Sequence, residues 1–149
     1  MGFRKIVVND FEFLHKKSKE VVDFDNKLEE LIDDMIETLH SKKGAVGLAA
    51  PQVGILRRVV VIDVGEGVIE LVNPSIVEKN GEQIEMEGCL SFPDRYEKIK
   101  RPALVKVKAY DRKGKEFFKE GEGLLARAFC HEIDHLNGIV FLDRLNEEG

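Results

Sequence analysis

Two histidines and a glutamate, His131, Glu132 and His135, form a His-Glu-x-x-His pattern within a segment that predicts a helix over residues 124–136. In an α-helix, at about 100° per residue, positions four apart lie about 40° apart around the axis, so both imidazoles can bind one ion. Glu132 lies beside that face and can hold a metal-bound water without coordinating the ion, which suits a general base. The segment therefore predicts a metal-dependent hydrolytic site.

The third metal ligand is expected from an upstream segment. His-Glu-x-x-His runs on to Gly138, but Phe141 stands where metzincin proteases have a third histidine, which excludes that class. Upstream, Cys89 lies in a tight segment bounded by Gly88 and Pro93 and is the natural third ligand. Two imidazoles and one thiolate leave one position of a tetrahedral site for water, as hydrolysis requires.

The remaining polar residues of this helix are interpreted as structural. Cys130 points away from the two histidines around the helix axis, so we interpret it as a buried small hydrophobe. Asp134 either orients a histidine or pairs with Arg127 or Arg144, and it stays outside the catalytic set. An apolar stripe on a third side indicates an enclosed helix and consists of Leu125, Phe129, Ile133 and Leu136.

Other segments must position these groups. Apolar residues at helical spacing predict an amphipathic helix over residues 26–43, with Asn26 and Glu29 at its N-terminal cap, a stop at Gly44, and charges that only solvate its outer face. Strands are predicted over residues 58–64, 68–72, 75–78 and 103–110, and a turn at 111–114 leads into a further strand over 115–119. Helix, strands and helix in this order predict an α+β fold with neighbouring antiparallel strands.

Composition limits the class of protein. The chain has 149 residues, of which 43% are hydrophobic and 34% charged, and this predicts one domain over residues 1–149. A net charge of −5 argues against nucleic acid as a direct partner. No apolar run reaches the ~18 residues of a membrane span and none resembles a secretion signal, so we expect a cytoplasmic protein without a disulfide scaffold.

A further segment, residues 44–52, combines small residues with a terminal amide. Its sequence is Gly-Ala-Val-Gly-Leu-Ala-Ala-Pro-Gln, which is typical of backbone that approaches another group closely. A simple turn explains the same pattern equally well. Gln52, at its end, can donate a hydrogen bond to a substrate carbonyl.

Together, three segments resemble peptide deformylase. They are residues 47–52 (Gly-Leu-Ala-Ala-Pro-Gln), 87–91 (Glu-Gly-Cys-Leu-Ser) and 131–136 (His-Glu-Ile-Asp-His-Leu), in the order and separation of that family. The likeness extends from Arg4 to Leu145. It departs from the family where the two residues Ala45 and Val46 follow Gly44 in place of one, where Cys130 replaces a common glutamine, and where Phe11 replaces a common proline.

The resemblance implies sheets packed around a central helix that carries the His-Glu-x-x-His motif. It also implies hydrolysis of the formyl group from the N-terminal formylmethionine of new polypeptides, with release of formate. Cys89, His131 and His135 would bind the metal, and Glu132 would move a proton from water to the leaving amine. The oxygen that becomes negative would be stabilised by the metal and by two donors, the Gln52 amide and the backbone N–H of Leu90.

The resemblance further implies a substrate pocket, a cofactor and partners. The substrate-binding residues would be Val46, Gly47, Glu87, Gly88, Leu125 and Ala128. One divalent ion per chain is implied, Fe²⁺ in most of the family, with Zn²⁺, Ni²⁺ or Co²⁺ also able to occupy the site. Formylmethionyl peptides and nascent chains are the implied partners of a monomer that contacts no membrane. A transient ribosome contact stays open, since the basic C-terminal extension by which some members bind the ribosome is absent after Leu145.

Two other functions use the same residues. A metallopeptidase with the same motif would cut internal peptide bonds and act on unformylated peptides. A catalytically inactive homologue or binding module would hold a structural ion, which requires a closed four-ligand site. The other histidines, His15 and His40, fall in other segments and do not supply a fourth ligand at suitable spacing.

Overall fold

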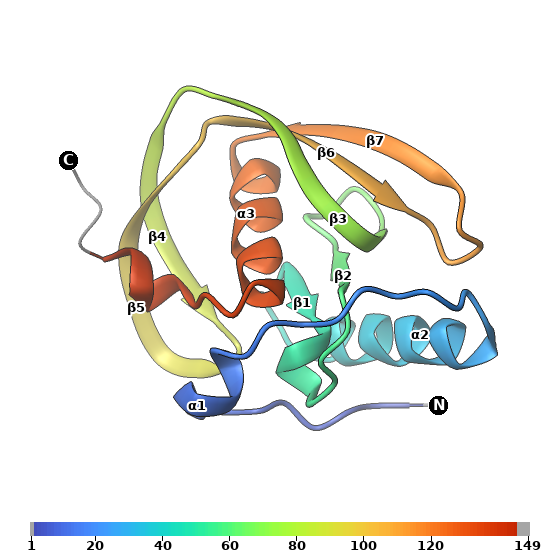
Figure 1. The fold of residues 1–149 in the computed structure, drawn as a ribbon. Coiled ribbons are helices and arrows are strands. Elements are labelled where there is room, and N and C mark those ends of the chain that lie inside the picture. Colours follow the sequence, from blue (N-terminus) through green and yellow to red (C-terminus); the bar gives the residue numbers. More distant parts are fainter. Residues whose placement is uncertain (1, 146–149) are drawn as a thin grey trace.

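The computed structural model describes residues 2–145, which form two antiparallel sheets around a central helix (Figure 1). The elements in chain order are α1 (Phe11–Leu14), α2 (Asn26–His40), β1 (Gly47–Ala49), η1 (Ala50–Val53), β2 (Val59–Ile62), β3 (Ile69–Asn80), β4 (Gln83–Cys89), β5 (Phe92–Arg101), β6 (Leu104–Tyr110), β7 (Glu116–Glu122), α3 (Leu124–Leu136) and η2 (Phe141–Arg144). One sheet has the order β1-β2-β3-β6-β7, and β4 pairs with β5 alone. The α+β fold expected from the sequence is confirmed.

The β1–β2 end of the large sheet is covered by a helix on each face. All four residues of β2 are buried. Val60 and Ile62 pack in the cluster that contains α3, while Val59 and Val61 pack in the cluster that contains α2. Successive side chains of a strand point to opposite faces, so this uninterrupted apolar run fills both. The sheet therefore separates α2 from α3. Helix α3 lies between the sheet and the β4–β5 hairpin (Figure 1).

Helix α3 occupies the predicted range, residues 124–136, and is buried along almost its whole length. Every residue from Ala126 to Leu136 is buried, and these include the charged residues Arg127, Glu132 and Asp134. Buried charges are costly unless they are paired, so the partners of these side chains decide what the helix can do. Within residues 2–145, none of the helices has the length and apolar character needed to cross a membrane.

Helix α2 differs from its sequence prediction at both ends. It stops at His40 rather than at residue 43, with Ser41 as its C-terminal cap. Its N-terminal cap is Asp25 and not Asn26, because the Asp25 carboxylate accepts a hydrogen bond from the Leu28 N–H at 3.0 Å. An aspartate oxygen satisfies a backbone donor of the first turn that would otherwise be unpaired.

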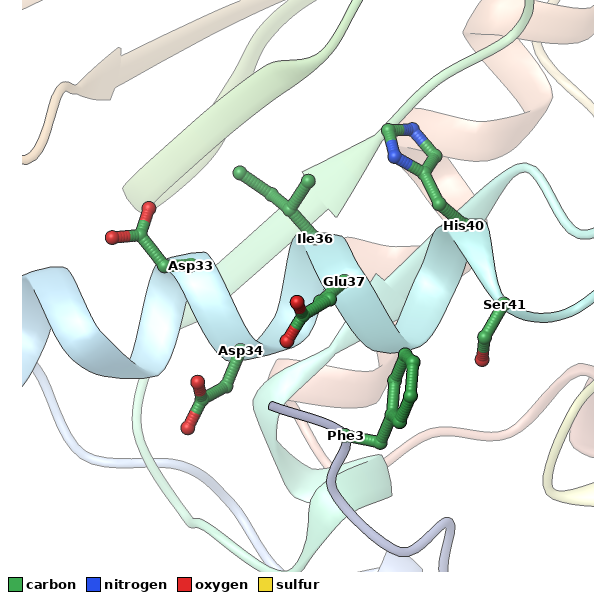
Figure 2. Close-up of a pocket in the computed structure, with 7 residues that line it drawn as sticks. All are labelled: Phe3, Asp33, Asp34, Ile36, Glu37, His40 and Ser41. Atoms are coloured by element: carbon green, nitrogen blue, oxygen red, sulfur yellow. The ribbon is translucent and has the colours of Figure 1, made fainter. Parts of the chain in front are cut away.

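An open groove of about 530 Å³ lies along the outer face of α2 (Figure 2), lined by Phe3, Asp33, Asp34, Ile36, Glu37, His40 and Ser41. Asp34 is buried, and its carboxylate accepts hydrogen bonds from the Gly2 N–H at 2.9 Å and from Arg4 Nε at 3.0 Å. The prediction that charges on this face only solvate the helix was therefore wrong for Asp34, which ties the N-terminal segment to α2.

The central strands agree with prediction at β2, β6 and β7 but not at β3. The strands predicted over residues 68–72 and 75–78 are one strand, with a register shift between Val72 and Ser75. Asn73 lies in this shift with a φ of 50°, and its side chain makes hydrogen bonds of 2.9 Å to the N–H and the carbonyl of Val21. Proline cannot donate a ladder hydrogen bond, so the bulge lets β3 pass through Pro74 without ending.

The β4–β5 hairpin was not predicted, and its strand β4 has a reversed polarity. Ile84 and Met86 are 52% and 55% exposed, whereas Glu87 is only 5% exposed. Apolar side chains that face outwards and an acid that faces inwards hide the strand from an analysis based on hydrophobic alternation. The hairpin brings both Glu87 and Cys89 to α3.

Gly138 allows the chain after α3 to pass close to the N-terminal segment. It has a φ of 74°, and a Cβ atom there would lie 2.5 Å from the backbone oxygen of His15. Gly138→Ala is expected to lower the free energy of unfolding by more than about 1 kcal/mol, measured by urea denaturation, because backbone strain and a steric contact add. Gly44→Ala is the matched control, since Gly44 has a φ of 83° but no atom within 4 Å of such a Cβ. Equal losses in both variants would show that the contact with His15 contributes nothing.

Candidate metal centre

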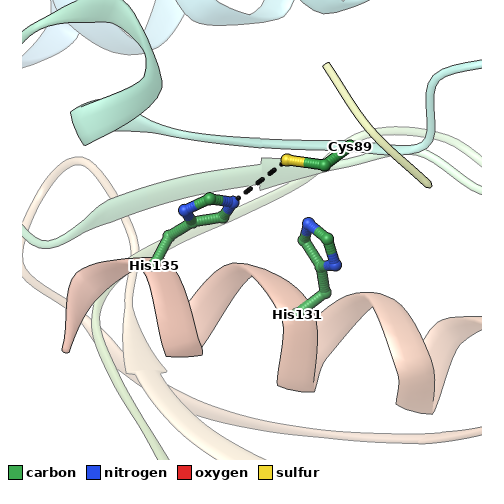
Figure 3. A group of neighbouring side chains, drawn as sticks. All are labelled: Cys89, His131 and His135. Carbon is green, nitrogen blue, oxygen red and sulfur yellow. Dashed lines mark hydrogen bonds between the residues drawn. The ribbon is translucent and has the colours of Figure 1, made fainter. Parts of the chain in front are cut away.

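Cys89 at the end of β4 and two histidines of α3 meet in one place (Figure 3). Their ligand atoms all lie within 4.8 Å of one another, and Cys89 Sγ is 3.4 Å from His135 Nε2. Tetrahedral ligands at about 2.0–2.3 Å from an ion are separated by roughly 3.5 Å, so the spacing fits one ion. Burial lowers the pKa of His135 well below its usual value and keeps the imidazole neutral, the form that binds metal.

The second ring nitrogen of His131 is held by a carboxylate. His131 Nδ1 lies 2.7 Å from Glu87 Oε1, so a proton on Nδ1 is donated to Glu87 and the Nε2 lone pair is left for an ion. Burial alone would raise the pKa of Glu87, but hydrogen bonds from Arg101 and His131 outweigh it and hold this pKa well below the usual range. Arg127 also donates to Glu87, at 2.8 Å. The acceptor positions of the Glu87 carboxylate are thus taken, so its role towards a substrate stays a prediction.

Glu132 is buried beside the ligands with little hydrogen bonding. It is 4% exposed, and its Oε1 atom has no hydrogen-bond partner within residues 2–145. Burial raises the pKa of Glu132 to about 7. A carboxylate with a pKa near neutral can both take up and return a proton.

Gly47 of β1 packs directly against Glu132. A Cβ atom at Gly47 would lie 2.6 Å from Glu132 Oε2. The sequence left open whether the small residues of the 44–52 segment form a simple turn or a close approach, and at Gly47 the structure shows a close approach. Glycine gives the buried carboxylate the space that any side chain would fill.

Gln52 of η1 is fixed with its amide nitrogen towards the site. Its Oε1 atom accepts a hydrogen bond from the Ala49 N–H at 3.0 Å. Its Nε2 atom lies 3.2 Å from Ser91 Oγ and 3.5 Å from Cys89 Sγ. The Gln52 side chain therefore presents a donor beside the ligands. Leu90 lines a cleft beside these residues, and the role of its backbone N–H stays a prediction.

A cleft of about 510 Å³ opens beside the ligands. Five of the six residues expected to bind substrate line it, namely Val46, Gly47, Glu87, Gly88 and Ala128. Leu125 does not, because it packs against the core cluster of α3, and the half-exposed Leu124 lines the cleft instead. Sequence analysis also missed Met86 and Tyr96, which line the cleft from the unpredicted hairpin.

Cys130 and Asp134 line a different cavity, of about 420 Å³. Cys130 is buried in the core cluster, and burial raises its pKa to about 11. Asp134 pairs with Arg144 at 2.8 Å, one of the two partners that the sequence left open, and also with Arg101 at 2.8 Å. The alternative partner, Arg127, donates to Glu87 instead.

Comparison with known proteins gives one consistent result. A sequence model of the polypeptide deformylase family matches residues 3–149. A peptide deformylase from Alkaliphilus metalliredigens is 54% identical over 148 residues, which cover 99% of this chain and 100% of that protein. Crystal structures of peptide deformylases from Legionella pneumophila and Thermotoga maritima both match with a TM-score of 0.92 over 97% of this chain. They are 47% and 43% identical, with 86% and 98% of their own chains covered.

The two cysteines are expected to behave differently towards metal. Cys89→Ala removes one of the three converging ligand atoms and should abolish stoichiometric binding of a divalent ion. Cys130→Ala changes only the core side of α3 and should retain one ion per chain. Metal content after anaerobic purification, counted by mass spectrometry, measures both. Equal loss in the two variants would overturn the assignment of Cys89.

Proposed function

The chain belongs to the peptide deformylase family, and we propose that Cys89, His131 and His135 hold its metal ion while Glu132 moves the proton. Proteins of this family are metal-dependent hydrolases that remove the formyl group from the N-terminus of nascent polypeptides, and this is the activity of the chain. The observation that supports these residue roles is the convergence of one sulfur and two imidazoles beside a buried carboxylate whose Oε1 atom has no hydrogen-bond partner among the described residues, 2–145.

An ion held by Cys89, His131 and His135 would supply positive charge that makes an adjacent water more acidic and polarises the formyl carbonyl. Glu132 accepts the proton of the attacking water at Oε1, the oxygen without a hydrogen-bond partner among residues 2–145. It then returns that proton to the nitrogen of the leaving amine, so that formate and a free N-terminus are the products. A pKa of about 7 suits both transfers near neutral pH.

The oxygen of the formyl group becomes negative as water attacks, and chain donors stabilise it. Gln52 Nε2 is oriented for this role by the hydrogen bond that Gln52 Oε1 accepts from Ala49. We propose the backbone N–H of Leu90 as the second donor. The loss of one such donor costs on the order of 3 kcal/mol of transition-state stabilisation in other hydrolases.

The methionine side chain is proposed to occupy the cleft beside the ligands. Val46, Gly47, Gly88 and Ala128 line it with small or apolar surface, and its volume of about 510 Å³ is within the range of ligand pockets. The exposed side chains of Met86 and Tyr96 belong to the same cleft and are placed to contact residues that follow the methionine.

The cofactor, the partners and the location follow from the same activity. We propose one divalent ion per chain, because a thiolate with two imidazoles suits Fe²⁺, Zn²⁺, Ni²⁺ and Co²⁺ alike. Fe²⁺ is proposed as the physiological ion because it is the ion of most of the family. We further propose a monomer of one domain that acts in the cytoplasm, where nascent chains carry their formyl group. A transient ribosome contact is compatible with this substrate.

Formate release from formyl-Met-Ala-Ser, with Met-Ala-Ser as the matched unformylated peptide, tests the function directly. Protein purified anaerobically with one equivalent of metal should release formate from the first peptide and leave both peptide backbones intact. Free methionine or dipeptide without formate would instead establish a metallopeptidase. Metal bound without either product would indicate an inactive homologue.

Glu132→Ala is expected to keep the metal and lose turnover. None of the three ligand atoms changes, whereas the proton carrier disappears, so kcat should fall by about 10²-fold to 10⁴-fold. Formate release and metal content, measured on one preparation, check the two halves of the expectation. Loss of metal in this variant would mean that Glu132 is a ligand and not a base.

Gly47→Ala should displace the Glu132 carboxylate without touching a ligand. The added methyl group would lie 2.6 Å from Glu132 Oε2, so we expect a fall in kcat at unchanged metal content. Gly44→Ala, three residues upstream in the same segment, adds a methyl group with no neighbour within 4 Å and serves as the control. A variant at Gly47 with full activity would show that the position of this carboxylate is not critical.

A further inference from the structure

A set of buried charged groups extends from His131 to the opposite side of α3. Its first member is the Glu87 carboxylate, which receives four hydrogen bonds. The donors are His131 Nδ1 at 2.7 Å, Arg101 Nη2 at 2.7 Å, Arg101 Nε at 2.9 Å and Arg127 Nη1 at 2.8 Å. A carboxylate offers about four acceptor positions, so Glu87 is saturated and cannot rotate without breaking several contacts.

Arg101 continues the set beyond Glu87. Its Nη1 atom donates to Asp134 Oδ2 at 2.8 Å, on the side of the guanidinium that Glu87 does not use. Asp134 is held in turn by a bidentate pair from Arg144, with Nε at 3.0 Å and Nη2 at 2.8 Å. Arg101, Glu87 and Asp134 are 3%, 5% and 8% exposed. The sequence of contacts is therefore His131, Glu87, Arg101, Asp134 and Arg144.

Stability alone does not account for this arrangement. Apolar residues of similar volume often replace a buried ion pair without loss of stability, because desolvation offsets the attraction between the charges. Charged side chains fix the direction of the hydrogen bonds that they make, and apolar side chains cannot do this. Only one ring orientation lets His131 donate from Nδ1 to a fixed Glu87, and that orientation presents Nε2 to the ion.

We propose that Arg101 and Asp134 are positioning residues for the metal ligand His131 and act on it through Glu87. The inference rests on the proposed ion site of Cys89, His131 and His135. Neither side chain is among the groups that converge there. Asp134 instead fixes the guanidinium of Arg101, and Arg101 fixes both oxygens of Glu87 by its paired hydrogen bonds.

The chain contains a matched control for this arrangement. Arg112, in the turn between β6 and β7, makes paired hydrogen bonds to Glu70 of β3 and also contacts Asp33 of α2 at 2.9 Å. The chemistry is again a glutamate, an arginine and an aspartate. Within residues 2–145, however, the hydrogen bonds and ion pairs of these side chains involve none of the proposed metal ligands. Arg112→Lys and Asp33→Asn therefore make the same chemical changes as Arg101→Lys and Asp134→Asn, away from the ion.

The experiment follows Co²⁺ in five proteins, the wild type and these four variants. The quantities measured are the rate at which Co²⁺ passes from the protein to a chelator and the absorption spectrum of the Co²⁺-loaded protein. Asp134→Asn and Arg101→Lys should each release Co²⁺ about tenfold faster, since loss of outer partners of metal ligands costs about 10-fold to 100-fold. Their spectra should also change, because the His131 ring tilts. The two controls should match the wild type.

The outcomes distinguish failure of the positioning role from failure of the proposed ion site. The positioning role alone is overturned if the wild type binds one Co²⁺ per chain and the variants Asp134→Asn and Arg101→Lys both keep the wild-type release rate and spectrum. Wild type that binds no Co²⁺ overturns the proposed ion site and the inference with it. Should Asp134→Asn fail to fold, Asp134→Glu retains the charge and moves the carboxylate by one methylene. Wild-type release and spectra in Asp134→Glu and Arg101→Lys would then overturn the role.

Discussion

The hydrogen bond between His131 Nδ1 and Glu87 Oε1 joins the helix that carries two of the proposed metal ligands to the strand that carries the third. Cys89 follows Glu87 by two residues on β4, and His135 follows His131 by four on α3. Residues two apart on a strand and four apart on a helix lie on one side of their element. One contact between the elements therefore brings Cys89 near His135 as well, and the 3.4 Å between their ligand atoms is the result.

The burial of α3 explains why so many arginines surround the site. The helix is enclosed between the large sheet and the β4–β5 hairpin, so its charged side chains cannot reach water (Figure 1). Arg127 of the helix pairs with Glu87 of β4. Asp134 of the helix pairs with Arg101 and Arg144. These partners also hold the hairpin against the helix. The packing of the core and the geometry of the ligands are thus maintained by the same contacts.

The sequence predicts α3 and its histidine face closely, because a strong helical period is bounded by Gly123 and by Asn137 with Gly138. It cannot predict the role of Glu87, whose partners Arg101 and Arg127 lie 14 and 40 residues away and belong to no local pattern. The strand that presents Glu87 is also hidden, since Ile84 and Met86 of β4 point outwards. Local periodicity reveals elements whose inner face is apolar, whereas the inner face of β4 carries Glu87.

Two buried glutamates show how the fold separates structural from chemical roles. Glu87 and Glu132 are 5% and 4% exposed, yet Glu87 receives four hydrogen bonds while Glu132 Oε1 receives none within residues 2–145. The donors hold the pKa of Glu87 well below its usual range, whereas burial raises the pKa of Glu132 to about 7. Glu87 is therefore a fixed negative charge that orients a ligand, and Glu132 is a group that can change its protonation near neutral pH. Gly47 leaves room beside Glu132 and supplies no side-chain donor. Among residues 2–145, Glu132 Oε1 therefore stays buried without a hydrogen-bond partner, which is the condition that the proposed proton transfer requires.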